Sequence, residues 1–181
     1  HTIMQTSSCN ILVGTWNFGV FNYDQHFNAI PLPPSLQAIQ ADLSVWDIHE
    51  HSKTGKIWIA LQAGGLVVYD PKTGITQKEY PPVFNARTIR QVTEDQQGNL
   101  WFGTQGGKII KWDYQKGGNN IKEGYHLVTT TGLVHDMITD NRGFIWIATL
   151  AHGLLQLDAR DNKIIKTYMT KGRQGQTLLN N

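Results

Sequence analysis

The segment GNLWFGTQGGKIIKWD, residues 98–113, decides the fold, because three similar segments occur elsewhere in the chain. In register with it lie CNILVGTWNFGVFNYD (residues 9–24), GKIWIALQAGGLVVYD (55–70) and GFIWIATLAHGLLQLD (143–158). All four segments end in Asp, and the equivalent positions Leu12, Trp58, Trp101 and Trp146 lie 46, 43 and 45 residues apart. A repeat of about 40–45 residues is typical of four-stranded propeller blades.

Each repeat has the residue pattern of a small antiparallel sheet. An alternating run predicts a first, inner strand, at residues 45–48, 89–92 and 134–137. A polar turn follows, and then a short, uniformly apolar run predicts a second strand buried between neighbouring repeats, at residues 57–60, 100–103 and 145–148. A glycine-bearing turn leads to a third strand, as at residues 66–69, and outer strands are predicted at about 75–80 and 164–168.

The pattern predicts an all-β fold, a β-propeller of four consecutive four-stranded antiparallel blades that form a fragment of a larger propeller of the seven-bladed type. Residues 1–181 are then a single propeller segment with blade 1 at about 1–34, blade 2 at about 44–82, blade 3 at about 87–128, blade 4 at about 132–170, and a linker to a next blade at 171–181. Two other features are expected: a single helical turn within 35–41 and a mobile outer loop at 116–124.

Composition excludes several partners. The 181 residues are 40% hydrophobic and 17% charged, as in a globular chain with a core, and the net charge is only +2. Neither nucleic acid nor direct membrane contact is expected, because the chain has no basic stripe and no apolar run near 20 residues. The single cysteine, Cys9, rules out an internal disulfide and any multi-cysteine zinc site, and no cofactor is indicated.

The motifs resemble a known repeat, the two-component regulator propeller repeat. The resemblance is carried by residues 89–95, 98–104 and 65–74, with departures at Leu12, Lys108 and Leu157. It implies the periplasmic sensor region of a hybrid two-component histidine kinase of the Bacteroides type. In that family the sensor has paired seven-bladed propellers, an immunoglobulin-like domain, a membrane segment and a cytoplasmic kinase.

The loops that lead into the inner strands, and those that join second and third strands, should emerge together around the central channel. That face is the usual binding surface of a propeller. Its aromatic, Arg, Asn, Gln and His side chains suit a polyhydroxyl ligand, although an ordinary wet loop surface is the alternative. The candidate ligand-binding residues are Trp16, Asn17, Trp46, Arg87, Arg90, Gln105, His135 and His152.

No catalytic or metal site is predicted. The sequence His49-Glu50-His51 lacks the i, i+4 spacing of zinc proteases and is interpreted as a solvated strand end. Trp58, Trp101 and Trp146 recur at one repeat position and are assigned to the core. Asp47 and Asp136 are the only pair of carboxylates on the expected binding face that an enzyme could use.

Two classes of function remain open, and a third has less support. The first is a non-enzymatic, periplasmic sensor segment whose parent detects an oligosaccharide and signals to a kinase. The second is a propeller enzyme, a lyase or glycan hydrolase, and the third is a protein-interaction scaffold. Because His1 aligns with Arg90 inside an inner strand, we expect an open arc that is completed by the remaining blades of a parent chain or by self-association.

Overall fold

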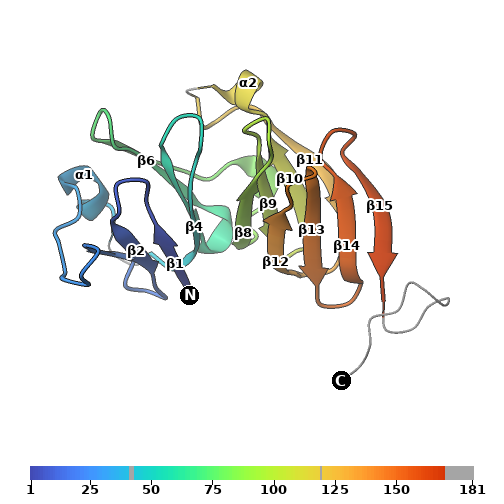
Figure 1. Cartoon of the computed structure of the whole chain (residues 1–181), viewed down its shortest axis with the longest axis horizontal. Coiled ribbons are helices and arrows are strands. Elements are labelled where there is room, and N and C mark those ends of the chain that lie inside the picture. The colour runs from blue at the N-terminus through green and yellow to red at the C-terminus, as the bar shows by residue number, and fades with distance from the viewer. Residues whose placement is uncertain (41–42, 119, 170–181) are drawn as a thin grey trace.

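A computed structural model describes residues 1–40, 43–118 and 120–169 as four small antiparallel sheets that follow one another along the chain (Figure 1). The first sheet has three strands and each of the others has four, hydrogen-bonded in sequence order. The strands are β1 (Thr2–Gln5), β2 (Ile11–Gly14) and β3 (Val20–Tyr23); β4 (Val45–Glu50), β5 (Ile57–Leu61), β6 (Leu66–Asp70) and β7 (Ile75–Glu79); β8 (Ile89–Glu94), β9 (Leu100–Thr104), β10 (Lys108–Trp112) and β11 (Tyr125–Thr130); and β12 (Val134–Thr139), β13 (Phe144–Thr149), β14 (Gly153–Asp158) and β15 (Lys163–Tyr168).

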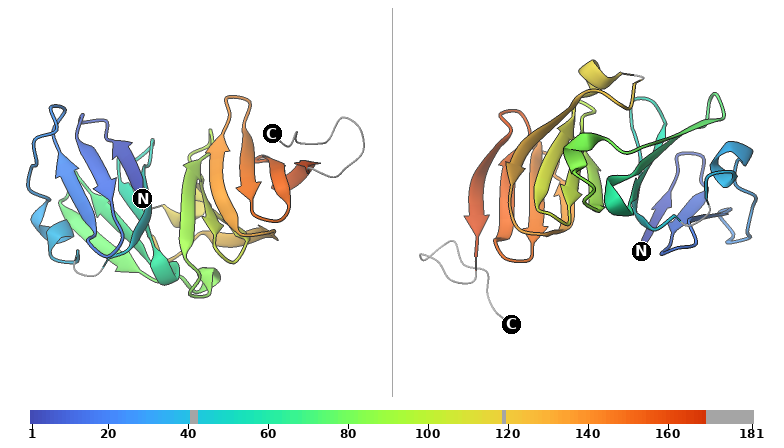
Figure 2. Two further views of the ribbon diagram at one scale, coloured as in Figure 1. Left: turned by 90° about the horizontal axis from the view of Figure 1, so that it is seen from below. Right: turned by 180° about the vertical axis from the view of Figure 1, so that it is seen from behind.

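The sheets are arranged as an open arc. Figures 1 and 2 place the first sheet and the last sheet at opposite ends of the molecule. The first strand of each sheet lies on the inner side of the arc, and neighbouring first strands contact one another: β1 contacts β4, β4 contacts β8, and β8 contacts β12. The all-β propeller arrangement predicted from the repeats is therefore confirmed.

The prediction of four strands in every blade is wrong for the first sheet. After β3 the chain turns and makes only an isolated bridge between Tyr23 and Ala29, followed by one hydrogen bond from the Ile30 amide to the Asn22 carbonyl at 2.9 Å. Three of the next four residues are prolines, at positions 31, 33 and 34. Proline has no amide hydrogen, so this segment cannot continue a ladder as an outer strand.

The short helical elements lie in the connections. The expected turn near residue 35 is α1 (Pro34–Gln37), and its predicted end at Ala41 lies outside the described residues. The segment 116–124, expected to be a mobile outer loop, overlaps α2 (Tyr114–Gly117) at its first two residues. The Asp113 carboxylate caps the N-terminus of α2 by accepting from the amides of Gln115 and Lys116. Two 3₁₀ turns, η1 (Gln62–Gly64) and η2 (Pro82–Phe84), complete the set, and the predicted linker 171–181 lies outside the described residues.

The core consists of three apolar clusters, one at each junction between consecutive sheets. Every residue of β5 and of β9 is buried, because both faces of these strands are covered by other sheets. Trp58 is 1% exposed and Trp101 is 0% exposed, so both lie in the core as predicted. Trp146 was assigned to the core by the same repeat position but is only partly buried, since no described sheet packs on its side of β13.

In the third and fourth sheets, one aspartate fixes the turn before the second strand. The Asp95 carboxylate accepts hydrogen bonds from the Asn99 amide at 2.9 Å and from Trp101 Nε1 at 2.9 Å. Asp140 repeats the arrangement in the last sheet with Trp146 Nε1 at 3.0 Å. A buried tryptophan is stabilised when its N–H has such a partner, so the turn and the core are coupled.

Replacement of Trp101 by alanine should destabilise the fold by about 3–5 kcal/mol, because it removes a fully buried ring from the junction between the third and fourth sheets. Trp16, which is 44% exposed, is the matched control, and Trp16→Ala should cost less than about 1 kcal/mol. Chemical denaturation of the three proteins measures both values. Equal losses in the two variants would contradict the assignment of Trp101 to the core.

Candidate ligand-binding face

A bulge at the same position of three inner strands displays one extra residue on each. The pairing register shifts between Val45 and Asp47 in β4, between Ile89 and Gln91 in β8, and between Val134 and Asp136 in β12. The residues left unpaired by these shifts are Trp46, Arg90 and His135. A bulge redirects a side chain without breaking the sheet, so three of the predicted binding residues occupy one equivalent, displayed position.

The loops between second and third strands are tied to the start of the inner strand of the same sheet. Backbone hydrogen bonds join Gln62 to the Ser44 carbonyl at 3.1 Å, Gln105 to the Thr88 carbonyl at 2.9 Å, and Leu150 to the Leu133 carbonyl at 2.9 Å. The two sets of loops expected to share a face are therefore held together by the backbone itself.

Four side chains meet on this face at the junction of the first three sheets. The Trp16 and Trp46 rings lie edge to face, with centroids 5.5 Å apart, and the Arg90 guanidinium carbon is 4.5 Å from the Trp46 ring centroid. The His1 ring lies 4.7 Å from that of Trp46. Trp46 Nε1 and Arg90 Nε have no hydrogen-bond partner among the described residues. We call Trp16, Trp46 and Arg90 the channel cluster.

Asn17 supports the cluster from the loop next to it. It has a positive φ of 63°, which asparagine tolerates better than most residues, and its side-chain oxygen accepts a 2.6 Å hydrogen bond from Ser44 Oγ. Ser44 also accepts from the Asn17 amide at 3.3 Å. Sequence reasoning missed Ser44, because nothing in the repeat pattern marks a serine just before an inner strand.

The remaining predicted residues are exposed but lie apart from the channel cluster. The Arg87 side chain packs against Gly106, in the turn that also contains Gln105. His152 packs on Gly132, and its amide donates to Thr149 Oγ1 at 3.1 Å. In residues 1–40, 43–118 and 120–169, no hydrogen bond or ring contact joins Arg87, Gln105, His135 or His152 to the channel cluster.

Asp47 holds three inner strands together. Its Oδ1 accepts from Thr2 Oγ1 on β1 at 3.1 Å and from the Ile48 amide at 2.9 Å, and its Oδ2 accepts from the Val92 amide on β8 at 2.8 Å. Burial raises the pKa of Asp47 above its ordinary value, although these hydrogen bonds oppose the rise. Both carboxylate oxygens are thus used by the fold itself. Asp136, its equivalent on the last sheet, is exposed and accepts from the Met137 amide at 2.8 Å.

The sequence His49-Glu50-His51 is not the solvated strand end that was predicted. His51 is completely buried, with Nδ1 2.8 Å from Thr54 Oγ1 and Nε2 2.7 Å from the Gly98 carbonyl oxygen. It is buried because the third sheet covers the turn in which it lies. His49 Nε2 is 3.0 Å from Glu94 Oε2, on the same neighbouring sheet. In the described parts of the chain no three His, Cys, Asp or Glu side chains are grouped as metal ligands.

Glu94 forms a polar contact between the second and third sheets. Besides His49, it accepts from the Ser52 amide at 2.8 Å and from the Ser52 hydroxyl. Burial alone would raise the pKa of Glu94, but the hydrogen bonds from His49 and Ser52 outweigh it and hold the pKa below its ordinary value of 4.5. The first junction repeats the contact, since Glu50 accepts from the amide and hydroxyl of Ser7.

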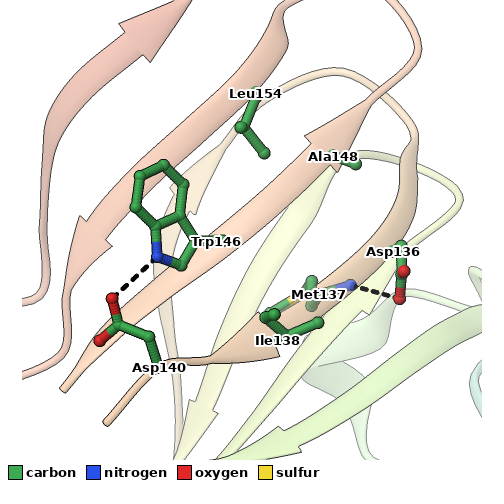
Figure 3. Close-up of a pocket in the computed structure, with 7 residues that line it drawn as sticks. All are labelled: Asp136, Met137, Ile138, Asp140, Trp146, Ala148 and Leu154. Atoms are coloured by element: carbon green, nitrogen blue, oxygen red, sulfur yellow. Dashed lines mark hydrogen bonds between the residues drawn. The ribbon is translucent and has the colours of Figure 1, made fainter. Parts of the chain in front are cut away.

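A hollow of about 420 Å³ lies on the uncovered face of the last sheet (Figure 3). The Trp146 ring forms one side of it, and its Nε1 donates to Asp140, which lowers the pKa of that carboxyl. In the second and third sheets the equivalent tryptophans are covered by the next sheet. This hollow is therefore the inter-sheet surface of the repeat, left open at the end of the described chain. Its lining residues are Asp136, Met137, Ile138, Asp140, Trp146, Ala148 and Leu154.

Comparison with known proteins agrees with this architecture. Residues 84–106 match the family model described as "Two component regulator propeller". This segment is therefore similar to one two component regulator propeller repeat. The matched segment runs from η2 through β8 and β9, which includes Arg87, Arg90 and Gln105. The resemblance proposed from the sequence is confirmed at this repeat.

Two solved structures show the same fold. One is described as the extracellular domain of a hybrid two component system, BT3049 from B. thetaiotaomicron; it superposes with a TM-score of 0.73 at 18% identity, over 99% of this chain and 23% of that chain. The other is from a mitotic checkpoint complex, with a TM-score of 0.67 at 12% identity, over 92% of this chain and 48% of that chain. This chain spans less than half the length of each. No curated protein sequence matches it.

No helix in the described residues has both the length and the apolar character needed to cross a bilayer.

The contacts of Glu94 predict a pH-dependent contribution to stability. Because its pKa in the fold lies below 4.5, the ionised carboxylate stabilises the fold above that pH, and the contribution is lost as the pH falls through the folded-state pKa. Glu94→Gln should therefore lower the free energy of unfolding by about 1–2 kcal/mol at pH 7 and by progressively less below pH 4.5.

Glu123→Gln is the matched control, because Glu123 is exposed and its side chain makes no hydrogen bond among the described residues. Denaturant titrations of the three proteins between pH 3 and 7 measure the difference. A gap between wild type and Glu94→Gln that stays constant over this range would show that the ionised form is not what stabilises the junction.

Proposed function

We propose that this chain is a segment of a periplasmic sensor propeller of a two-component histidine kinase, and that its channel face binds an oligosaccharide. The repeat match at residues 84–106 and the likeness to the extracellular domain of a hybrid two component system support the sensor. The chain itself is proposed to be non-enzymatic. The channel cluster is the single observation that carries the proposal of a ligand.

The chemistry of the channel cluster suits a sugar. Trp16 and Trp46 offer ring surfaces against which the C–H faces of a pyranose pack, and Trp16 is 44% exposed. Arg90 stacks on Trp46, which leaves its guanidinium N–H groups as donors toward hydroxyl oxygens. The Asn17 side chain lies exposed next to the cluster and adds an amide N–H donor, since its oxygen already accepts from Ser44. Gln105 is exposed on the same face, although apart from the cluster.

The cluster also supplies a physical route from ligand to signal. Trp16 belongs to the first sheet, Trp46 to the second and Arg90 to the third. A ligand that contacts all three favours one relative arrangement of these sheets over others. Such differential binding is what a sensor requires in order to shift a conformational equilibrium.

The enzyme alternative has weaker support. A lyase or glycan hydrolase needs two carboxylates free to exchange protons with a substrate. Asp47 instead accepts hydrogen bonds from Thr2, Ile48 and Val92, so its oxygens already have partners. A protein-interaction scaffold remains the third candidate, and a panel of glycans distinguishes it from the sensor.

Calorimetric titration with xylo-, manno-, arabino- and galacto-oligosaccharides tests the proposal. At least one is expected to bind, and Trp16→Ala and Arg90→Ala should each weaken its affinity about tenfold or more, the equivalent of about 1.4 kcal/mol. Phe27→Ala is the control: Phe27 is 73% exposed but lies in the turn after β3, at the other end of that strand from the Trp16 loop.

Binding of one glycan that is lost in Trp16→Ala and Arg90→Ala and kept in Phe27→Ala supports a sugar-binding channel face. Absence of binding by every glycan, or equal losses in all three variants, would contradict it.

A further inference from the structure

A second cavity, of about 290 Å³, lies between the first and second sheets. It opens at the end of the sheets that carries the β1–β2, β4–β5 and β6–β7 turns, whereas the channel cluster lies at the other end of β3. Its walls are mainly apolar and include Leu12, Leu36, Ile57 and Tyr69. Its size approaches the lower limit of small-molecule pockets, about 300 Å³.

The cavity exists because the first repeat departs from the others at two paired positions. Across β2 and β3, Leu12 pairs with Asn22; the equivalent pair is Trp58 with Val68 in the second sheet and Trp101 with Lys111 in the third. These residues face the next sheet, so each junction is filled by the pair that precedes it. Of the three junctions in the described residues, the first receives the pair without an aromatic side chain.

The other two junctions show what normally occupies this space. At the second junction the Trp58 ring packs against Trp112, with centroids 4.8 Å apart, and His51 and Tyr114 complete an aromatic layer. At the third, Lys111 lies 4.9 Å from the Trp101 ring centroid and donates to the Asn162 side chain of the next sheet at 3.2 Å. An indole ring thus fills this space at both junctions, and at the third a polar contact with the following sheet is added.

Asn22 lacks the contact that Lys111 makes. Its side chain lines the cavity, the residue is only 8% exposed, and its Oδ1 has no hydrogen-bond partner among the described residues. The side-chain nitrogen, Nδ2, donates to the Pro31 carbonyl at 3.4 Å. The side-chain oxygen is therefore the atom that lacks a partner. Leaving such an acceptor buried and unpaired costs free energy, so the site favours an occupant with a donor group.

The nearby carboxylate does not compete for that donor. Glu50 also lines the cavity, but its oxygens already accept from the amide of Ser7 at 2.6 Å and from the Ser7 hydroxyl. Among the polar atoms in the buried part of the lining, Asn22 Oδ1 is therefore the one without a partner. The other polar residues of the lining, Thr6, Ser8, Asn10 and Lys72, are partly or fully exposed.

We propose that this cavity binds a small aromatic molecule with a single N–H or O–H donor, an indole-like or phenol-like ring. The ring takes the place that tryptophan fills at the other junctions, and its donor reaches Asn22 Oδ1. The site is separate from the channel face and does not rest on the sensor proposal. An aromatic occupant there would tighten the first junction in the way that Trp58 and Trp101 tighten the others.

Indole and N-methylindole are the probes, because they differ in the one donor that the proposal requires. Ligand-observed NMR titration should show one saturable site for indole on the wild-type chain and about three- to tenfold weaker binding of N-methylindole, as expected for the loss of one hydrogen bond. In Asn22→Leu, which keeps the volume but removes the acceptor, the two probes should bind equally.

Leu12→Trp restores the residue of the other repeats and should abolish indole binding by filling the cavity. Leu36→Phe fills the same space from α1 and replaces that test if Leu12→Trp does not fold. Leu127→Ala, which removes an exposed side chain from β11 in the third sheet, is the control and should bind indole as the wild type does. No saturable binding of indole to the wild type, equal affinity of the two probes for it, or undiminished binding in a folded cavity-filling variant would each overturn the proposal.

Discussion

Packing of each sheet against the next is the interaction on which the rest of this structure depends. A sheet of three or four short strands has no interior of its own, so its apolar residues are removed from water only by a neighbour. The second strand supplies the central side chain, a tryptophan in three of four repeats, and the aspartate of the preceding turn binds the indole N–H in the last two. Where the neighbour is present, as for Trp58 and Trp101, the ring is fully buried.

The need for packing between sheets also explains which positions can vary in residue type and so take on a binding role. Bulge residues on the inner strands belong neither to the ladder nor to the inter-sheet core, so their identity can change without loss of packing. Trp46, Arg90 and His135 differ completely although they occupy one repeat position. The inter-sheet pair tolerates less change. In the first repeat, Leu12 and Asn22 leave a cavity and an unpartnered acceptor.

Structural properties that depend on residues within a single repeat could be predicted from the sequence. Strand positions, the burial of Trp58 and Trp101, and the exposed loop with Trp16 follow from alternation and repetition alone. Properties that need a partner from another repeat could not be predicted. The burial of His51 depends on the third sheet, and the partial exposure of Trp146 on the lack of a described sheet beside it. The unpartnered Asn22 Oδ1 depends on what the second sheet places opposite it. The missing fourth strand of the first sheet had a local signal in Pro31, Pro33 and Pro34, but those prolines were interpreted only as a connector.

Native-state hydrogen exchange, measured residue by residue, tests most directly whether packing between sheets is the source of stability. Amides of β5 and β9, which are covered on both faces, should exchange most slowly, and those of β13 to β15 clearly faster, because one face of the last sheet is open. Slowest exchange in β13 or β14, or uniform protection of the four second strands, would contradict this and would place the stability within individual sheets.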